Sequence, residues 1–441
     1  MTRLTLLSAA IAAVFALPAT AQHTTAPGFQ ELDALAIPTL DPFLNPAFAS
    51  LSSGEIVTFN GTTIELHDAA GAPLATLGTL PAFGFPSFVI VDPTETFVVI
   101  GESSLGGLWR CDIVGGRLTH IIDVPLNFDA DFDINSAWIY VSSSPGFGSG
   151  IVRIIRVNVN TGARQLVVEL PGVSGPLEVD NAGDLFYASI PGFFVPAGAV
   201  NILHWTSAQL TTDPAEDDLT ASVFSSGYDG GSSLERDPIS GHLYLAESVF
   251  GLPTPIVEID GSGSELGIVA TTDYTGGQLE IHAGAGAGSL HPFQPANVRL
   301  RFNSTNYNQT EPFDILSSEI ITVGPARPVA TLSGPTSGPA NKTLTITGAL
   351  PNSSILVLFG NVSFHNPNEV ALPLPGIDFP FHSALPQQYV RRLNVPAVTD
   401  ATGTAAFNYF DPGSLHGTQV MQALIRDTSN LTIGTSTFVL N

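Results

Sequence analysis

The sequence predicts an all-β protein, a β-propeller followed by a small β-sandwich. Three observations predict this fold class. A short phrase of apolar and turn residues recurs through the first two thirds of the chain. Glycine and proline are frequent, with 43 and 34 residues, and no segment sustains a helical period. Beyond residue 330, short strand-like runs alternate with turn signals.

The first residues are typical of a cleaved export signal. Met1–Arg3 is basic, Leu4–Leu17 is largely apolar, and Ala19–Ala21 presents small residues where a signal peptidase cuts. The apolar run is too short to span about 30 Å of hydrocarbon comfortably. We therefore expect residues 1–21 to be a signal peptide, and the mature chain to be secreted or held in the cell envelope or periplasm, without a membrane span.

The charge balance is strongly acidic, with 14 basic and 39 acidic residues, and Lys342 is the only lysine. Such a surface repels phosphate backbones, so nucleic acid is excluded as a partner. Cys111 is the only cysteine, which rules out an internal disulfide. It lies in a strand-like segment, where a buried small hydrophobe is expected and a nucleophile is not.

The recurring phrase is an apolar strand that ends at an Asp or Asn anchor, followed by a turn and a second apolar-aromatic strand. The anchors are Ser52, Asp92, Asn135, Asp180, Asp237 and His282. The repeat at Ser52 is partial, and the repeat at His282 is degenerate. Successive anchors are about 40 to 57 residues apart, and a four-stranded propeller blade takes about 40 to 50. The longest step holds an acidic insertion, Asp213–Asp218.

A second, outer hairpin recurs in phase with the first. Its turns are Asp68–Gly71, Asp112–Gly115, Asn158–Gly162 and Asp260–Gly263, which carry the residue types that tolerate tight turns. Two hairpins per repeat make one blade. We expect six blades in residues 22–325, one of them shared between the two ends of that range, and a seventh, degenerate blade stays open.

This phrase resembles the repeats of six-bladed propellers of the NHL and TolB-like kind over roughly residues 48–290. The resemblance implies a propeller. It implies no single activity, because that superfamily includes binding proteins, lactonases and lyases.

A linker is expected near Gly324–Pro328, and residues 330–441 are expected to form the sandwich. Its predicted strands are Leu344–Thr347, Ile355–Phe359, Thr404–Phe407, Gln419–Ile425 and Ser436–Leu440. The segment resembles the C-terminal sandwich modules of many large secreted bacterial proteins, which implies an accessory or surface role.

Standard catalytic motifs are absent from the sequence. His282 and His291 fall in one blade, but neither has a neighbour at metal-ligand spacing. The glycine-rich segment Gly284–Gly288 precedes no helix, so we expect a loop there and no nucleotide site. Asp129, Asp131 and Asp133 alternate along one strand and share a face, without the glycine and glutamate of an EF-hand loop.

The residue two before each anchor is acidic in four of the five repeats compared. These residues are Asp133, Glu178, Glu235 and Glu280, with Ile90 in the remaining repeat. They are expected on the innermost strand of each blade, where unpaired carboxylates are costly to bury and only the central channel offers water. We therefore predict an acidic ring around the channel that binds a cation such as Ca²⁺. The alternative is that each acid pairs with a hydroxyl, a main-chain N–H or Arg236 and fixes its blade.

The function expected first is an exported, non-enzymatic binding or cell-surface protein, with an extracellular ligand or an envelope component as partner. The alternative is a metal-assisted propeller hydrolase, lactonase or lyase acting at the central channel with a carboxylate base.

Overall fold

The computed structural model of the 441-residue chain describes most of it. The described residues are 23–26, 29–36, 46–134, 137–192, 195–211, 221–238, 240–248, 253–272, 278–283, 298–307, 315–325, 328–335, 338–349, 352–361, 370–372, 381–383, 391–411, 419–426 and 433–440. The expected signal peptide, the anchor Asn135, the acidic insertion, the glycine-rich segment and His291 lie outside these residues.

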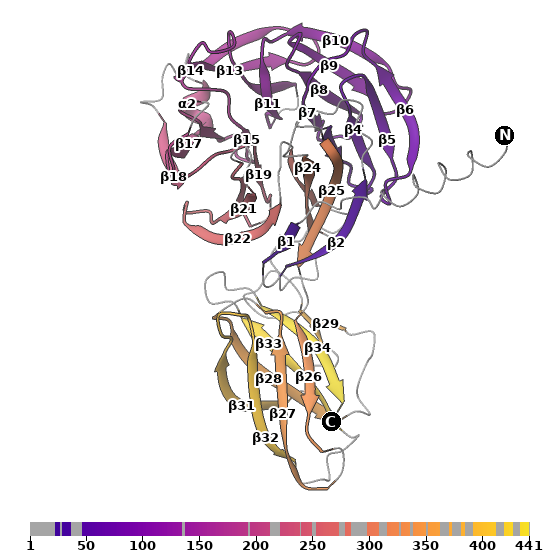
Figure 1. Cartoon of the computed structure of the whole chain (residues 1–441), viewed down its shortest axis with the longest axis vertical. Helices are drawn as coiled ribbons and strands as arrows, with labels where there is room; N and C mark the ends of the chain where they lie inside the picture. The colour runs from indigo at the N-terminus through magenta and orange to yellow at the C-terminus, as the bar shows by residue number, and fades with distance from the viewer. Residues whose placement is uncertain are drawn as a thin grey trace, which may run out of the picture.

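Antiparallel four-stranded sheets stand around a ring, which is the predicted propeller (Figure 1). The first sheet is β3 (Ala47–Ser50), β4 (Ile56–Phe59), β5 (Thr63–His67) and β6 (Pro73–Thr79). The second is β7 (Pro86–Val91), β8 (Phe97–Glu102), β9 (Gly107–Asp112) and β10 (Leu118–Asp123). The third is β11 (Asn127–Phe132), β12 (Trp138–Ser143), β13 (Ile151–Asn158) and β14 (Arg164–Pro171). The fourth is β15 (Leu177–Val179), β16 (Leu185–Ser189), β17 (Val200–Trp205) and β18 (Ser222–Tyr228).

The last two sheets of the ring use strands from the start of the chain. The fifth is β19 (Ser233–Arg236), β20 (Leu243–Ala246), β21 (Thr254–Ile259) and β22 (Glu265–Thr272), extended at its edge by β1 (His23–Thr25). The sixth is β23 (Leu279–Ala283), β24 (Val298–Tyr307) and β25 (Ile315–Pro325), completed by β2 (Phe29–Ala36). The expected sharing of one blade between distant segments is therefore seen in the sixth sheet.

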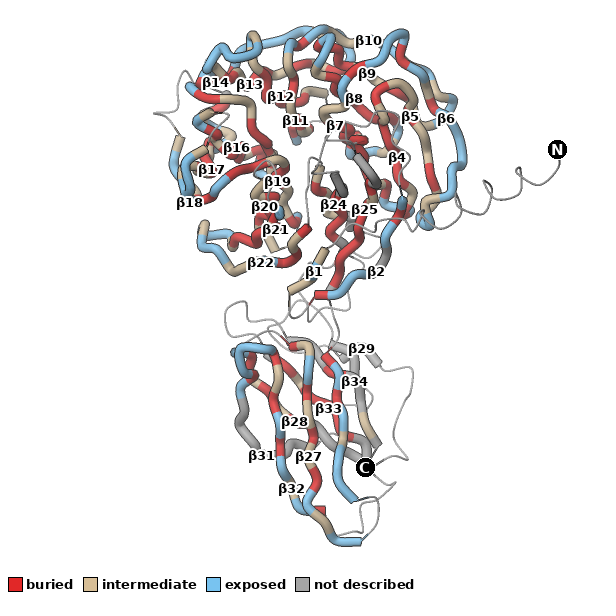
Figure 2. The backbone as a smooth tube through the Cα atoms, in the orientation of Figure 1, coloured by how far each residue is buried: buried red, intermediate tan, exposed pale blue. Residues whose placement is uncertain are grey.

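The innermost strands close on themselves. Each lies against the next in the order β3, β7, β11, β15, β19, β23 and back to β3. The described residues of the ring thus form six blades. Figure 2 shows buried backbone in the interior of the ring and exposed backbone along the outer strands β6, β10 and β18.

Short polar turns explain why each hairpin forms where it does. Asp92 ends β7, and its Oδ1 accepts hydrogen bonds from the N–H groups of Thr96 and Phe97 at 2.6 and 2.8 Å. The outer turns close in the same way: the N–H groups of Ala70 and Ala72 donate to Asp68 Oδ1 at 2.9 and 2.8 Å. An Asx side chain that binds its own turn holds the two strands in register.

The third repeat is shifted relative to its expected alignment. The Asp133 N–H donates to the Trp138 carbonyl, as the Asp92 N–H donates to Phe97 and the Asp237 N–H to His242. Asp133, and not Asn135, is therefore the structural anchor of this blade. The residue two before it, which faces the channel, is Asp131.

The core lies between neighbouring blades. One cluster joins the second and third blades through four fully buried side chains, Phe88, Val99, Ile139 and Val157. Cys111 is buried in the cluster between the first two blades, and burial raises the pKa of its thiol to about 11. It is therefore a packed hydrophobe, as expected. The described helix is α2 (Ser207–Thr211), a single turn. Among the described helical residues, none forms a segment long and apolar enough to cross a membrane.

The C-terminal segment forms two packed sheets and a small hairpin. One sheet is β26 (Val329–Ser333), β27 (Ala340–Thr347) and β32 (Ala405–Asp411). The other is β31 (Arg391–Val398), β28 (Ser354–Asn361), β33 (Gln419–Arg426) and β34 (Ile433–Leu440), and the hairpin is β29 (Val370–Leu372) with β30 (Phe381–Ser383). Leu344 and Phe407 from the first sheet share one core with Val357 and Ile425 from the second. This is the packing of a sandwich, and each predicted strand falls on an observed one or overlaps it. The proposed domain boundaries at residues 325 and 330 stay predictions.

Candidate functional site

The axis of the propeller holds a narrow polar cavity, here called the acidic channel. Its volume is about 170 Å³. The acidic residues that line it are Asp129, Asp131, Glu178, Glu235 and Glu280. They come from β11, β15, β19 and β23, the innermost strands of four consecutive blades, and Ile90 lines it from β7.

Three of the four residues predicted for the ring thus lie together, and one does not. Glu178, Glu235 and Glu280 line the channel, whereas Asp133 is absent from its described lining. Asp133 instead accepts a hydrogen bond from Arg156 Nη2 at 2.7 Å and is almost fully buried. Asp131 stands in the place expected of Asp133. His282 lies on β23, but its side chain is outside the described part of the chain.

The acids tie neighbouring blades to one another. Asp131 Oδ2 accepts from the Val179 N–H at 2.8 Å, and Asp129 Oδ2 accepts from the Leu177 N–H at 3.0 Å. Glu235 accepts from the Ile281 N–H of the next blade. Arg236 contacts Asp180 at the rim and stacks over Phe186. Main-chain pairing of this kind is the alternative considered for the ring, and it is present at Asp129, Asp131 and Glu235.

The channel environment keeps protons on its carboxyl groups. Burial, opposed in part by main-chain hydrogen bonds, raises the pKa of Asp131 to about 7. Burial raises the pKa of Glu178 well above its usual range, and the charges of Asp131 and Glu235 add to the effect. Burial and the neighbouring Glu280 do the same for the pKa of Glu235, and burial raises the pKa of Glu280 to about 8. Crowded, buried carboxyls cannot all ionise at once, so several are neutral at neutral pH.

The calcium prediction can be compared with this arrangement. In the described residues, no group of three or more His, Cys, Asp or Glu side chains is disposed to hold a metal ion. The oxygens of Asp129 and Asp131 already accept main-chain N–H groups. A Ca²⁺ ion takes six to eight oxygen ligands, and the side chains as they lie do not supply such a set.

A larger cavity opens at one mouth of the channel and is here called the funnel. Its volume is about 540 Å³. Its walls come from loops between blade strands, among them the β12–β13 loop with Phe147 and the β14–β15 loop with Ser174. Asp129, Ser233 and Gln278 line both cavities, so the funnel leads directly into the acidic channel.

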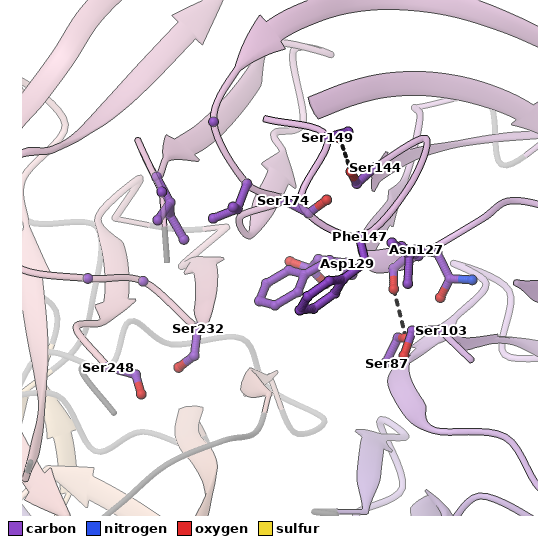
Figure 3. Close-up of a pocket in the computed structure, with 18 of the residues that line it drawn as sticks. Ser87, Ser103, Asn127, Asp129, Ser144, Phe147, Ser149, Ser174, Ser232 and Ser248 are labelled. Atoms are coloured by element: carbon purple, nitrogen blue, oxygen red, sulfur yellow. Dashed lines mark hydrogen bonds between the residues drawn. The ribbon is translucent and has the colours of Figure 1, made fainter. Parts of the chain in front are cut away.

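The lining of the funnel is rich in hydroxyl groups and has no basic side chain among its described residues. Its serines are Ser87, Ser103, Ser144, Ser149, Ser174, Ser232, Ser233 and Ser248. Figure 3 shows most of these serines in the loops around the cavity, together with Phe147, Asn127 and Asp129. Phe147 is 87% exposed, which is unusual for an aromatic ring.

Two buried polar atoms in the funnel wall lack a hydrogen-bond partner within the described structure. They are Asn127 Oδ1 and Ser174 Oγ. The Asn127 amide nitrogen is fixed by the carbonyls of Glu102 and Val124, at 2.7 and 3.1 Å, so its oxygen is held in place. A buried polar atom without a partner costs free energy unless water or a ligand satisfies it.

Asp129 forms the floor between the two cavities. It is 8% exposed, and burial, assisted by the charge of Asp131, raises its pKa to about 8. Asp129 and Asp131 are alternate residues of β11 and point to the same face. The site therefore holds a buried carboxyl with a raised pKa at the base of the funnel and a second carboxyl on the same face of β11.

Asp129 and Asp131 were not predicted to line the channel. The available signal was the alternation of three aspartates on one strand, which the alignment assigned to Asp133 alone. The serines of the funnel lie in loops of different blades and carry no spacing that marks them as one surface.

No protein-family model matches the chain, and no curated protein matches it. Several solved structures are similar in fold. A gluconolactonase from Xanthomonas campestris is 15% identical with a TM-score of 0.44, over 69% of this chain and 91% of that one. A calcium-binding protein, regucalcin, from Agrobacterium tumefaciens is 14% identical with a TM-score of 0.46, over 69% of this chain and 97% of that one. A protein of unknown function from Bacteroides thetaiotaomicron is 11% identical with a TM-score of 0.45, over 69% and 76% of the two chains. At these values the likenesses carry no conclusion about activity.

Proposed function

We propose that the chain binds a small, uncharged ligand in the funnel and acts on it by acid–base chemistry, as a hydrolase or lactonase. The observation that carries the proposal is Asp129, a buried carboxyl with its pKa near 8 at the floor of a 540 Å³ cavity. A concave site with a strongly perturbed titratable group is the arrangement expected of an active site. We therefore favour the hydrolase or lactonase alternative of the sequence analysis over the non-enzymatic one, without the metal assistance expected there.

The residues present define the roles. Asn127 Oδ1 accepts a hydrogen bond from the ligand, Ser174 Oγ accepts or donates one, and Phe147 covers the ligand with an apolar face. Water adds to an ester or lactone carbonyl, and Asp129, protonated at neutral pH, donates its proton to the alkoxide oxygen that leaves when the tetrahedral intermediate collapses. The proton released by the added water then returns to Asp129. Asp131 is two residues further along β11, on the same face of the strand. It is the carboxyl that can exchange a proton with Asp129. An anionic ligand is disfavoured because no described lining residue is basic.

The test is turnover of a panel of uncharged lactones and esters by the purified chain. We expect hydrolysis that falls at least about a hundredfold in Asp129→Asn. Ligand affinity should change little, because the substituted amide keeps the shape of the side chain. Loss of binding together with turnover would show that Asp129 only shapes the funnel.

A non-enzymatic binding role is the second candidate, and the hydroxyl-rich lining favours it. It predicts saturable binding of neutral ligands, with no turnover in the wild-type chain. Under that outcome the role of Asp129 is limited to its hydrogen bond with the Leu177 N–H of the next blade.

Calcium stays a prediction of the sequence analysis. If the channel binds it, the ligands would be Glu178, Glu235 and Glu280, with Asp131 in place of Asp133. Titration calorimetry with Ca²⁺ on the wild type and on Glu178→Gln/Glu235→Gln tests this prediction. Equal and negligible heats in both proteins would show that the channel does not bind Ca²⁺.

Export is also part of the proposal. The strand β1 begins at His23, just after the expected cleavage point, and pairs with β22, His23 opposite Thr272. Cleavage after Ala21 would therefore leave β1 and β2, the strands from the start of the chain that complete the fifth and sixth sheets, intact. Mass spectrometry of the protein recovered from an exporting host should give Gln22 as the first residue, and a retained leader would contradict export with cleavage.

A further inference from the structure

The only lysine of the chain is buried in the C-terminal sandwich. Lys342 lies on β27 and is 4% exposed, on the same face as the core residues Leu344 and Ile346. The Cγ atom of Lys342 would lie 3.1 Å from a Cβ added to Gly334, whose φ is +126°. A glycine at that turn thus lets the backbone close over the lysine stem. Lysine is among the residue types least often buried, so this position calls for an explanation.

The lysine amine contacts a buried carboxyl on the neighbouring strand. Lys342 Nζ lies 3.0 Å from Asp411 Oδ2, and the Asp411 side chain is 0% exposed. On the paired strands, Lys342 is opposite Tyr409 and Ala340 is opposite Asp411. The amine therefore reaches diagonally across the ladder to a fully enclosed carboxyl.

A phenol completes the group. The Tyr409 hydroxyl is buried and has no hydrogen-bond partner among the described residues. Burial, and after it the charge of Asp411, raises the pKa of Tyr409 to about 12. The phenol therefore keeps its proton and lies within electrostatic reach of the carboxyl.

We propose that Lys342 and Asp411 are joined by an amide bond that forms autocatalytically once the sandwich has folded. Two buried charges are costly, and passing the ammonium proton to the carboxylate leaves a neutral amine and a neutral carboxylic acid. The amine lone pair attacks Cγ of Asp411, a C–N bond forms, one C–O bond breaks, and the displaced hydroxyl leaves as water with a proton from the amine. Tyr409, whose hydroxyl lies within electrostatic reach of the carboxyl, relays that proton. The step needs no oxidant and no cofactor.

The bond has a structural consequence that fits this chain. With a single cysteine, the protein cannot form an internal disulfide. An amide between β27 and β32 locks two paired strands that are far apart in sequence, and it removes a buried ion pair by converting it to a neutral group.

The test is the intact mass of the full-length protein, followed by peptide mapping. We expect a mass lower than that of the sequence by one water, and a branched tryptic peptide that contains both Lys342 and Asp411. Because Lys342 is the only lysine, an amine-reactive reagent applied to the unfolded chain reports directly on its Nζ. The wild type should be labelled at its N-terminus alone, and Asp411→Ala should gain a second label at Lys342.

These readouts are made on unfolded protein, so a variant that fails to fold is still informative. Tyr409→Phe should slow the loss of water, giving a mixture of masses that converts with time. A wild-type chain of unmodified mass whose Lys342 takes the label would overturn the proposal and leave a plain buried ion pair. This outcome is independent of the funnel and of any turnover there.

Discussion

At the scale of single residues, several residues of the funnel lie in environments or conformations that are unfavourable to the free energy of folding. Asp129 holds a proton that an exposed aspartate would have lost, and Phe147 is exposed where most aromatic rings are covered. Leu126, also in the lining, has φ of +46°, in the left-handed region that a leucine rarely adopts. Strain, exposure and retained protons concentrate at sites that act on ligands, which is why these residues support the proposed function.

Phe147→Ala tests the contact face of the funnel. We expect about a tenfold loss of affinity for a neutral ligand, because the ring supplies an apolar contact, and no change in thermal stability, because the ring is solvent-exposed. Isothermal titration and a thermal melt measure the two quantities. Val114→Ala is the matched control, since Val114 is 88% exposed and does not line the funnel. Equal affinities in the two variants would remove Phe147 from the site.

At the scale of elements, the ring is closed by strands from the start of the chain. The strand β2 pairs with β25, with Leu35 opposite Ile320, and Leu35 packs with Phe48 and Ile56 of the first blade. The strand thus joins the sixth blade to the first as well as completing its own sheet. A ring with an unpaired edge at this point exposes a strand to aggregation.

Leu35→Ala should weaken this closure. Leu35 is 8% exposed, and removal of its side chain should lower the free energy of unfolding by about 2–4 kcal/mol. Urea unfolding followed by fluorescence measures the change. Leu74→Ala, at 52% exposure on the outer strand β6, serves as the control and should stay within about 0.5 kcal/mol of the wild type. Equal free energies of unfolding for Leu35→Ala and Leu74→Ala would indicate that the ring closes without a contribution from β2.

The elements also show how far the sequence can predict the structure. The hairpin turns were predictable because Asp92, Asp260 and their equivalents bind their own turn locally. The third repeat was misaligned because Asp133 and Asn135 each follow an apolar residue in the sequence and are both residue types that begin turns. Only the main-chain bond from Asp133 to Trp138 distinguishes them, and that bond depends on tertiary register. The funnel was not predictable, since its residues meet only when six blades are assembled.

At the scale of the whole molecule, the acidic channel sets the pH dependence of stability. The pKa values of Asp129, Asp131 and Glu280 are raised to between about 7 and 8, and those of Glu178 and Glu235 are also raised. The folded chain therefore keeps protons that the unfolded chain loses near pH 4. The free energy of unfolding must then fall as the pH rises from about 4 to about 8, with each raised pKa unit costing about 1.4 kcal/mol.

We accordingly expect a melting temperature several degrees higher near about pH 5 than near about pH 8.5, measured by calorimetry. Glu178→Gln/Glu235→Gln should flatten this dependence and stabilise the protein at the higher pH, because it removes two crowded carboxyls. Glu169→Gln/Glu265→Gln, at two exposed positions outside the channel lining, offers a comparison with the same charge change. A melting temperature that rises with pH would mean that the channel acids are ionised and paired with a cation.

The most direct measurement is the pKa of Asp129 in the folded protein. With aspartate labelled at its carboxyl carbon, a ¹³C NMR titration should show one resonance with a midpoint near pH 8 that is absent from Asp129→Asn. That result would establish a protonated carboxyl at the base of the funnel at neutral pH, as the proposed chemistry requires. A midpoint near about pH 4 for every aspartate would contradict it, since Asp129 would then have no proton to donate.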